Sequence, residues 1–141
     1  MAIQLGLEDG QVLSRKVDLT CQRTHIVTSQ TTTSTSAADL ATTGPAITLS
    51  PGITMDQLLS FGAYSLNTNA GVATEIDLQL NGAVVTGENY LYYMNGANYA
   101  SSPSKTVLAE AIPTGQTHRL RYLVGANTGT YANRFLVGVC L

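Results

Sequence analysis

The sequence predicts a single domain built from β-strands, and three observations carry this prediction. First, the chain has 141 residues, a length that suits one compact domain. Second, short runs of apolar and β-branched residues recur along it, separated by turns rich in glycine, proline and asparagine. Third, no segment shows a helical apolar stripe with capping residues. This pattern is typical of an all-β sandwich or barrel.

The first segment, residues 1–19, fits neither a helical nor a strand period, although it contains several leucines. An apolar segment without an internal partner is either frayed or docked onto another surface. We therefore expect residues 1–19 to form an arm or an added edge strand. Leu5, Leu7 and Leu13 are its candidate contact residues.

From Thr20 onward the chain becomes typical of strands. Residues 21–33 are rich in threonine and other β-branched residues, which pack well on a pleated surface. A polar stretch and a Gly-Pro turn at 44–45 follow. Residues 46–50 then alternate between apolar and polar, and Pro51 ends the run. We expect a strand in each of these two segments.

The clearest strand covers residues 72–80. Apolar or β-branched residues occupy every second position, and the acids Glu75 and Asp77 fall between them. A period of two over this length indicates a strand with one buried and one solvated face. The Asn-Gly pair at 81–82 follows directly, and such a pair favours a tight hairpin turn.

The last third of the chain repeats the pattern in residues 106–112, 118–124 and 131–141, with turns between them. If each strand turns its apolar positions inward, the sequence predicts a core shared by three strands. We expect the following side chains to be largely buried: Ile76, Leu78, Leu80, Leu120, Tyr122, Phe135, Val137 and Val139.

The composition excludes several functions. The net charge is −2 and the seven basic residues are scattered, so the phosphate-neutralising patch that nucleic-acid binding needs is missing. No apolar run is long enough to span a membrane, and the first residues do not read as a secretory signal. We therefore expect folding in a cytoplasm, where Cys21 and Cys140 stay reduced.

Catalytic chemistry has little support in the sequence. His25 and His118 are the only histidines, and neither has the spacing of a metal ligand, so a structural role in a strand is favoured. There is no nucleophile elbow and no phosphate loop. We expect no enzyme activity, no cofactor and no metal site.

Glu75 and Asp77 form the one pair of carboxylates that resembles a glycoside-hydrolysing site. The chain has no tryptophan to stack on a sugar, however. We interpret these acids as solvated residues of one strand face, paired across strands with Arg119 or Arg121.

A tyrosine-rich segment stands out at residues 90–99. Tyrosine provides a large contact area at low entropic cost and is enriched in interfaces. Tyr90, Tyr92, Tyr93 and Tyr99 are therefore candidates for a contact with another subunit or with a larger assembly, or for a glycan-binding loop. An ordinary strand whose aromatic side chains fill the sandwich explains the segment equally well.

Two parts of the chain resemble the trimeric jelly-roll virion proteins of tailed bacteriophages. The first reads TTTSTS at 31–36 and TGPAITLSP at 43–51. The second reads AIPTG at 111–115, HRLRY at 118–122 and NRFLVGV at 133–139, and it also resembles the last strands of trimeric jelly rolls of the tumour-necrosis-factor-like kind. The resemblance covers roughly residues 20–141.

The resemblance implies a jelly-roll β-sandwich of about eight antiparallel strands in residues 20–141, with residues 1–19 as the arm. It also implies a homotrimer on the capsid surface, assembled in the host cytoplasm, whose partner is the major capsid protein. The function implied is capsid decoration. The alternative is a receptor- or glycan-binding head domain of a tail or head fibre, with a host-surface glycan as partner.

The same resemblance makes the first and last strands neighbours, which would bring Cys21 and Cys140 near each other. A disulfide between them remains open at this point. Free, buried thiols are favoured because the protein is expected to fold in a cytoplasm.

Overall fold

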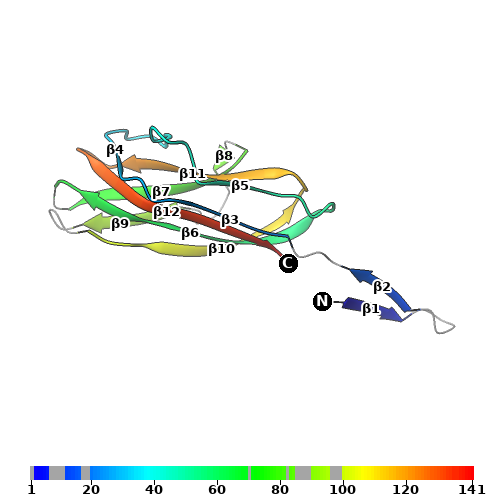
Figure 1. Cartoon of the computed structure of the whole chain (residues 1–141). Coiled ribbons are helices and arrows are strands. Elements are labelled where there is room, and N and C mark those ends of the chain that lie inside the picture. The colour runs from blue at the N-terminus through cyan, green and yellow to red at the C-terminus, as the bar shows by residue number, and fades with distance from the viewer. Residues whose placement is uncertain are drawn as a thin grey trace.

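The computed structural model shows a sandwich of two antiparallel β-sheets with a separate β-hairpin at the N-terminus (Figure 1). The backbone is described for residues 2–6, 12–16, 20–69, 71–81, 83–84, 90–95 and 100–141. Side chains are described for residues 20–69, 71–81 and 100–141.

The first sheet has the strand order β10-β6-β12-β3, and we call it the β6–β12 sheet. Its strands are β10 (Ser104–Ile112), β6 (Met55–Asn67), β12 (Gly129–Cys140) and β3 (Cys21–Ile26). The short strand β4 (Gln30–Thr32) also pairs with β12, beyond the end of β3. β3 and β4 therefore share one edge.

The second sheet has the order β5-β11-β7-β8, and we call it the β7–β11 sheet. Its strands are β5 (Ala46–Leu49), β11 (Gln116–Val124), β7 (Val72–Leu80) and β8 (Ala83–Val84). β9 (Tyr90–Asn95) pairs with β7 along residues 72–77, so β8 and β9 share the other edge.

The chain changes sheet repeatedly, which is the topology of a jelly roll. It passes from β3 and β4 to β5, back to β6, across to β7, β8 and β9, back to β10, across to β11 and finally to β12. Within the described residues each sheet thus has four strand positions, and every pairing is antiparallel. The predicted jelly-roll sandwich of about eight antiparallel strands is confirmed.

The two sheets are joined along one side by β3 and β5. The Thr24 hydroxyl donates to the Ala46 carbonyl at 2.9 Å, and the Thr48 amide donates to the Gln22 side-chain oxygen at 3.1 Å. Because these side chains satisfy backbone groups that would otherwise face outward, this edge is protected against pairing with another strand.

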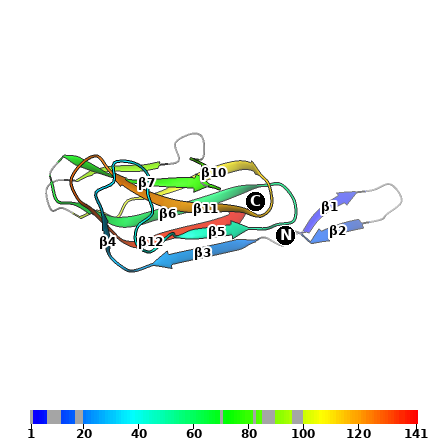
Figure 2. The ribbon, with the colours of Figure 1, turned by 90° about the horizontal axis from the view of Figure 1, so that it is seen from above.

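The N-terminal hairpin consists of β1 (Ala2–Gly6) and β2 (Val12–Lys16), which form a two-stranded sheet of their own. Leu5 and Leu13 are direct cross-strand partners in it, and Leu7 lies outside the described residues. Figures 1 and 2 both draw the hairpin beyond the end of the sandwich. Its sequence lacks a clear strand period, so the pairing was not visible in the sequence.

The core lies between the two sheets. Leu78, Leu120, Tyr122 and Leu136 are completely buried in it, and Ile76 is 1% exposed. Gly138 lets the sheets approach, because a Cβ at this position would lie 2.5 Å from the Ile47 Cδ1 atom of the opposite sheet. The predicted burial of Ile76, Leu78, Leu120 and Tyr122 is confirmed, and Leu80 is half-buried against this cluster.

The predicted inward face of the last strand is wrong. Phe135, Val137 and Val139 are only half-buried, whereas their neighbours Leu136 and Cys140 are fully buried. The reason is an irregularity in the pairing of β12 with β6 between residues 132 and 135, where Asn133 has φ of 47°. Such a bulge adds one residue to one strand and so exchanges its two faces from that point on.

One charged side chain, Arg134, is buried in the core next to Tyr122. The Arg134 side chain is fully buried and lies 5.4 Å above the centre of the Tyr122 ring. Its guanidinium donates to the Gln30 side-chain oxygen at 2.8 Å and to the Thr42 carbonyl at 3.2 Å. These bonds tie the crossing segment after β4 to the last strand, and they replace the water that a charged group requires.

Candidate functional site

Among the described residues, the outward face of the β6–β12 sheet brings together exposed and half-buried apolar side chains. The strand register places Leu108 of β10 opposite Leu58 of β6, Leu58 opposite Val139 of β12, and Val139 opposite Cys21 of β3. Directly opposed residues lie on the same face of a sheet, so these four side chains form one row across it. No residue in this row is charged.

Two further rows run parallel to the first one. The second row is Thr106, Ser60, Val137 and Arg23, and the third is Ser104, Gly62, Phe135 and His25. In the second row the hydroxyl oxygens of Ser60 and Thr106 lie 2.7 Å apart and hydrogen-bond to each other. If another molecule covered this row, both hydroxyls would therefore keep their hydrogen bond to each other.

We call the set Leu58, Leu108, Phe135, Val137 and Val139 the outer apolar face. Leu58 is 38% exposed and Leu108 is 51% exposed, and Leu141 at the end of the chain adds a side chain that is 57% exposed. Contiguous exposed apolar surface on a protein domain is typical of an interaction site.

Gly62 lies in the third row, between Ser104 and Phe135. A Cβ at this position would lie 2.5 Å from the Pro103 carbonyl oxygen and 3.0 Å from the Phe135 ring. Glycine at this position therefore lets the chain at the start of β10 and the Phe135 ring approach the backbone of β6 closely.

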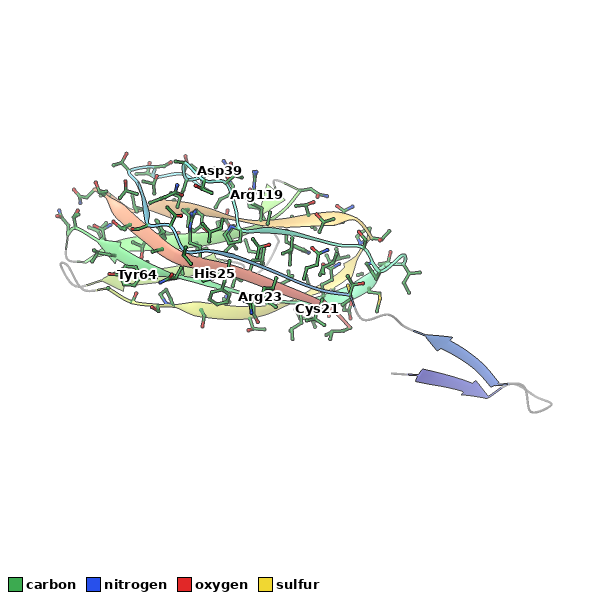
Figure 3. All side chains as sticks on the ribbon, viewed as in Figure 1. Cys21, Arg23, His25, Asp39, Tyr64 and Arg119 are labelled. Carbon is green, nitrogen blue, oxygen red and sulfur yellow. The ribbon has the colours of Figure 1, made fainter. Side chains whose placement is uncertain are left out.

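Charged residues lie at the two borders of the outer apolar face. Arg23 and His25 are exposed on β3, where Figure 3 shows them in line with Cys21. Asp56 of β6 and Glu110 of β10 are exposed, each two residues beyond the row of Leu58 and Leu108, and the Asp56 carboxylate accepts a hydrogen bond from the Ala111 amide at 2.8 Å. The β3 edge thus carries the base Arg23, and the ends of β6 and β10 carry two acids.

The sequence-predicted contact residues lie elsewhere. Tyr90, Tyr92 and Tyr93 belong to β9 in the β7–β11 sheet, and Leu5 and Leu13 belong to the N-terminal hairpin. Tyr99 lies outside the described residues, as Leu7 does. None of the five placed residues belongs to a strand that carries the outer apolar face.

Sequence reasoning missed the outer apolar face for two reasons. Leu58 and Leu59 are adjacent, so the sequence does not show which of the two points inward. The second reason is the bulge in β12, which turns three residues predicted for the core toward the outside. One signal in the sequence pointed to this face: residues 57–66 contain no charged side chain.

The two acids of β7 are less exposed than predicted. Asp77 is 5% exposed, so its interpretation as a solvated residue is wrong, although the predicted cross-strand pairing is present because Asp77 is the direct partner of Arg121. Burial raises the pKa of Asp77, while a hydrogen bond from Gln79 and the charge of Arg121 act against this rise. Burial also raises the pKa of Glu75, helped by the nearby charge of Asp77.

Arg119 has a different partner from the one predicted. It lies 3.6 Å from the Asp39 carboxylate, and Figure 3 shows the two side chains together over β11. Because both side chains are about one-third exposed, this pair contributes little stability.

His118 belongs to the core. It is completely buried, and its Nε2 atom lies 2.6 Å from the Gln57 side-chain oxygen. Burial lowers the pKa of His118 to about 4, so the imidazole is neutral at physiological pH. Among the described residues, no three His, Cys, Asp or Glu side chains come together as a metal site.

The two cysteines lie on neighbouring strands but on opposite faces. Cys21 is the direct partner of Val139, so Cys140 points to the other side of the sheet. Cys21 is accordingly exposed, Cys140 is buried, and both are free. The neighbouring strands were predicted correctly, but burial holds for Cys140 alone, where it raises the pKa of the thiol.

Known structures share the fold. Neither protein-family models nor curated proteins match the sequence. The Eiger TNF of S. frugiperda is similar, with a TM-score of 0.55, 13% identity, 87% of this chain covered and 92% of that one. The VP2 subviral particle of infectious bursal disease virus gives a TM-score of 0.56 and 10% identity. The match covers 96% of this chain and 36% of the viral chain, so this chain spans about a third of the length of the viral one.

A third similar structure is the CBM36-1 domain of a multidomain xylanase from the hindgut metagenome of Trinervitermes trinervoides. Its TM-score is 0.50 at 14% identity, with 82% of this chain and 96% of that domain covered. At such identities the likeness establishes the fold alone. The protein is therefore a jelly-roll β-sandwich. Within the described residues no helix is long and apolar enough to cross a membrane.

Proposed function

We propose that the protein is a virion structural protein that decorates a bacteriophage capsid as a homotrimer. The observation that carries this proposal is the outer apolar face, which is uncovered in the single chain and lies on a fold that the VP2 subviral particle shares. A second copy of the chain is the partner that we assign to this face.

The energetics favour self-association through this face. Full burial of a valine, leucine or phenylalanine side chain contributes about 1.5–3 kcal/mol. Leu58 is 38% exposed and Leu108 is 51% exposed, so covering either side chain would still contribute a substantial part of its burial free energy. Because only 11% of the residues are charged, few ionic groups lose water when the surface is covered.

A homotrimer would bind a capsid through several contacts at once. Each contact can be weak, since the second and third engage at the high effective concentration that the first one creates. We assign the capsid contact to the N-terminal hairpin, which pairs with no strand of the sandwich in the described residues. In this proposal the major capsid protein is the partner of the hairpin, and the chain assembles on the capsid surface in the host cytoplasm.

The test is binding of the purified chain to undecorated capsid shells, followed by electron microscopy of the particles. We expect trimeric density at regular positions over the head. Leu58→Asp places a charge between Leu108 and Val139 in the outer apolar face, and we expect a folded monomer that binds shells at least about 100-fold more weakly, because avidity is lost. Thr68→Asp, an exposed substitution beyond the end of β6, is the control. Wild-type trimers that leave the shells bare would contradict the proposal.

The alternative function, a glycan-binding fibre head, has one observation in its favour. In β9, Tyr90 and Tyr92 are the direct register partners of Asp77 and Glu75, which brings aromatic and acidic residues together on the β7–β11 sheet. Binding of the isolated trimer to a glycan array, with density only at fibre tips, would favour this alternative.

A further inference from the structure

The outward face of the β7–β11 sheet carries a cluster of polar side chains. Glu75, Asp77 and Gln79 occupy alternate positions of β7, on the face that points away from the core. Arg121 of β11 is the direct register partner of Asp77. Asp77 and Gln79 are 5% and 4% exposed, whereas Glu75 and Arg121 are half-buried. We call these four residues the polar cluster, and it reaches solvent through its two half-buried members.

Hydrogen bonding within the polar cluster leaves two atoms unused. The Gln79 Nε2 group donates to an Asp77 carboxylate oxygen at 2.9 Å. Because an ionised carboxylate can only accept, this bond fixes the orientation of the amide and leaves the Gln79 Oε1 atom for another donor. Among the described residues, the buried Gln79 Oε1 and Arg121 Nε atoms have no hydrogen-bond partner. The polar cluster thus holds one unused acceptor and one unused donor.

These two unused atoms need an explanation, because a buried polar atom without a hydrogen bond destabilises the folded state. Both atoms belong to side chains that meet at Asp77. Gln79 is bonded to its carboxylate, and the charge of Arg121 acts on the same group from the neighbouring strand. A bound molecule that supplied both missing hydrogen bonds would remove the cost of leaving the two atoms unpaired.

The charges of the polar cluster decide which class of molecule fits. Burial raises the pKa of Glu75 and of Asp77, so a further negative charge beside these carboxyl groups is unfavourable. A cation would meet the permanent positive charge of Arg121. A hydroxyl group is neutral, and it can donate to the Gln79 oxygen and accept from the Arg121 Nε–H group. Neutral sugars carry such hydroxyl groups on adjacent carbon atoms.

We propose that the polar cluster is a binding site for a neutral, polyhydroxylated ligand, an uncharged sugar. The Gln79 Oε1 atom accepts from one hydroxyl group, and the Arg121 Nε–H group donates to the same hydroxyl or to its neighbour. Glu75, which is half-buried, accepts from a further hydroxyl. The proposal goes beyond the capsid role and requires neither capsid binding nor self-association, because the outer apolar face belongs to the other sheet.

Nuclear magnetic resonance of the full chain tests the proposal, because the side-chain N–H signals of Gln79 and Arg121 report on the two groups directly. The probes are the methyl glycosides of glucose, galactose, mannose and N-acetylglucosamine. N-acetylneuraminic acid serves as an anionic probe and calcium chloride as a cationic one. We expect at least one methyl glycoside to shift both signals with a dissociation constant of about 1 mM, since few hydrogen bonds are formed. The anion and the cation should leave both signals unchanged.

Two substitutions on different strands show whether binding occurs at the polar cluster. Gln79→Leu removes the unused acceptor, and Arg121→Lys keeps the positive charge opposite Asp77 but removes the Nε–H donor. Each should weaken binding of the methyl glycoside at least about tenfold, the loss of one hydrogen bond. Arg119→Lys is the matched control, because Arg119 pairs with Asp39 and should not affect binding.

Melting temperatures identify the variants that are folded, and either variant of the polar cluster that folds decides the question. Weakened binding in that variant, with unchanged binding in the control, supports the proposal. A wild-type chain whose signals respond to none of the four methyl glycosides would overturn it. So would a folded variant that binds as the wild type does, or signals that respond to the anion or to calcium instead of a glycoside. None of these results bears on the capsid role, which binding to shells tests separately.

Discussion

A single buried histidine couples the stability of this domain to pH. Burial lowers the pKa of His118 to about 4 from an ordinary value near 6.5. Between these two pH values the unfolded chain binds a proton that the folded chain does not. Stability is therefore fully present above pH 6.5 and falls as the pH drops toward 4. The raised pKa values of Glu75 and Asp77 act in the opposite direction, since the folded chain holds their protons more tightly.

Substitution of this histidine isolates its contribution. We expect His118→Gln to remove the loss of stability between pH 6.5 and 4, which is on the order of 2–3 kcal/mol in the wild type. Thr28→Gln, at an exposed position that carries no titratable group, should keep the wild-type pH dependence. Urea unfolding at several pH values measures both. Equal slopes for His118→Gln and the wild type would show that His118 does not titrate as the structure implies.

Two leucines of different environment test the assignment of inner and outer faces. Leu78 is completely buried, so Leu78→Ala should lower the free energy of unfolding by about 2–5 kcal/mol through lost burial and a residual cavity. Leu108 is 51% exposed, and Leu108→Ala should cost the monomer less than about 1 kcal/mol. Thermal or denaturant unfolding at a concentration below association compares them. An unchanged melting temperature for Leu78→Ala would mean that the face assignment of β7 is wrong.

At the scale of elements, Gly62 and Gly125 differ in how closely neighbouring segments pack against them. A Cβ at Gly62 would meet the Pro103 backbone at 2.5 Å, which side-chain rotation cannot relieve. At Gly125 the nearest atom to such a Cβ lies 3.7 Å away, an ordinary contact. We expect Gly62→Ala to cost about 1–3 kcal/mol through overpacking, and Gly125→Ala to be tolerated. Denaturant unfolding tests both, and equal stability of the two variants would show that β10 can move away from β6 at little cost.

The N-terminal hairpin has a separate test at this scale. If the hairpin contacts the capsid, deletion of residues 1–15 should leave the melting temperature unchanged and reduce binding to shells at least about tenfold. If the segment stabilises its own sandwich instead, the same deletion should lower the melting temperature, and binding should fall only as a consequence. A well-folded truncation that binds shells as the wild type does would exclude the hairpin from the mechanism.

The sequence predicted those elements whose pattern depends only on neighbouring residues. β7 and β11 alternate without interruption, and the burial of Leu78 and Leu120 follows from that alternation. The outward turn of Val137 was not predictable, because it depends on a bulge in the pairing of β12 with β6. Pairing irregularities arise between strands far apart in sequence, so one strand alone does not reveal them.

The candidate site depended on the same kind of information. Tyrosine content directed attention to β9, whereas the uncovered apolar surface belongs to the other sheet. Leu58 and Leu108 become neighbours only when β6 and β10 pair. Likewise, Asp77 meets Arg121 only when β7 and β11 pair, a fact of topology rather than of local sequence.

At the scale of the whole molecule, a low charge content and an uncovered apolar sheet face belong together. A monomer in solution gains solubility from charges and from small apolar patches. A subunit of an assembly can have few surface charges and a large apolar patch, because its neighbours cover that surface. A chain with 11% charged residues and exposed leucines on one sheet fits the second case. In the proposed assembly the outward face of the β6–β12 sheet contacts other copies of the chain, and the separate N-terminal hairpin contacts a different partner.

Self-association is the central claim, and the mass of the purified chain in solution tests it most directly. We expect light scattering at micromolar concentration to give three times the mass of the 14.8 kDa chain, because a closed ring covers the outer apolar face of every copy. Leu58→Asp should give the mass of one chain at the same concentration. A wild-type mass of one chain at micromolar concentration would contradict the account.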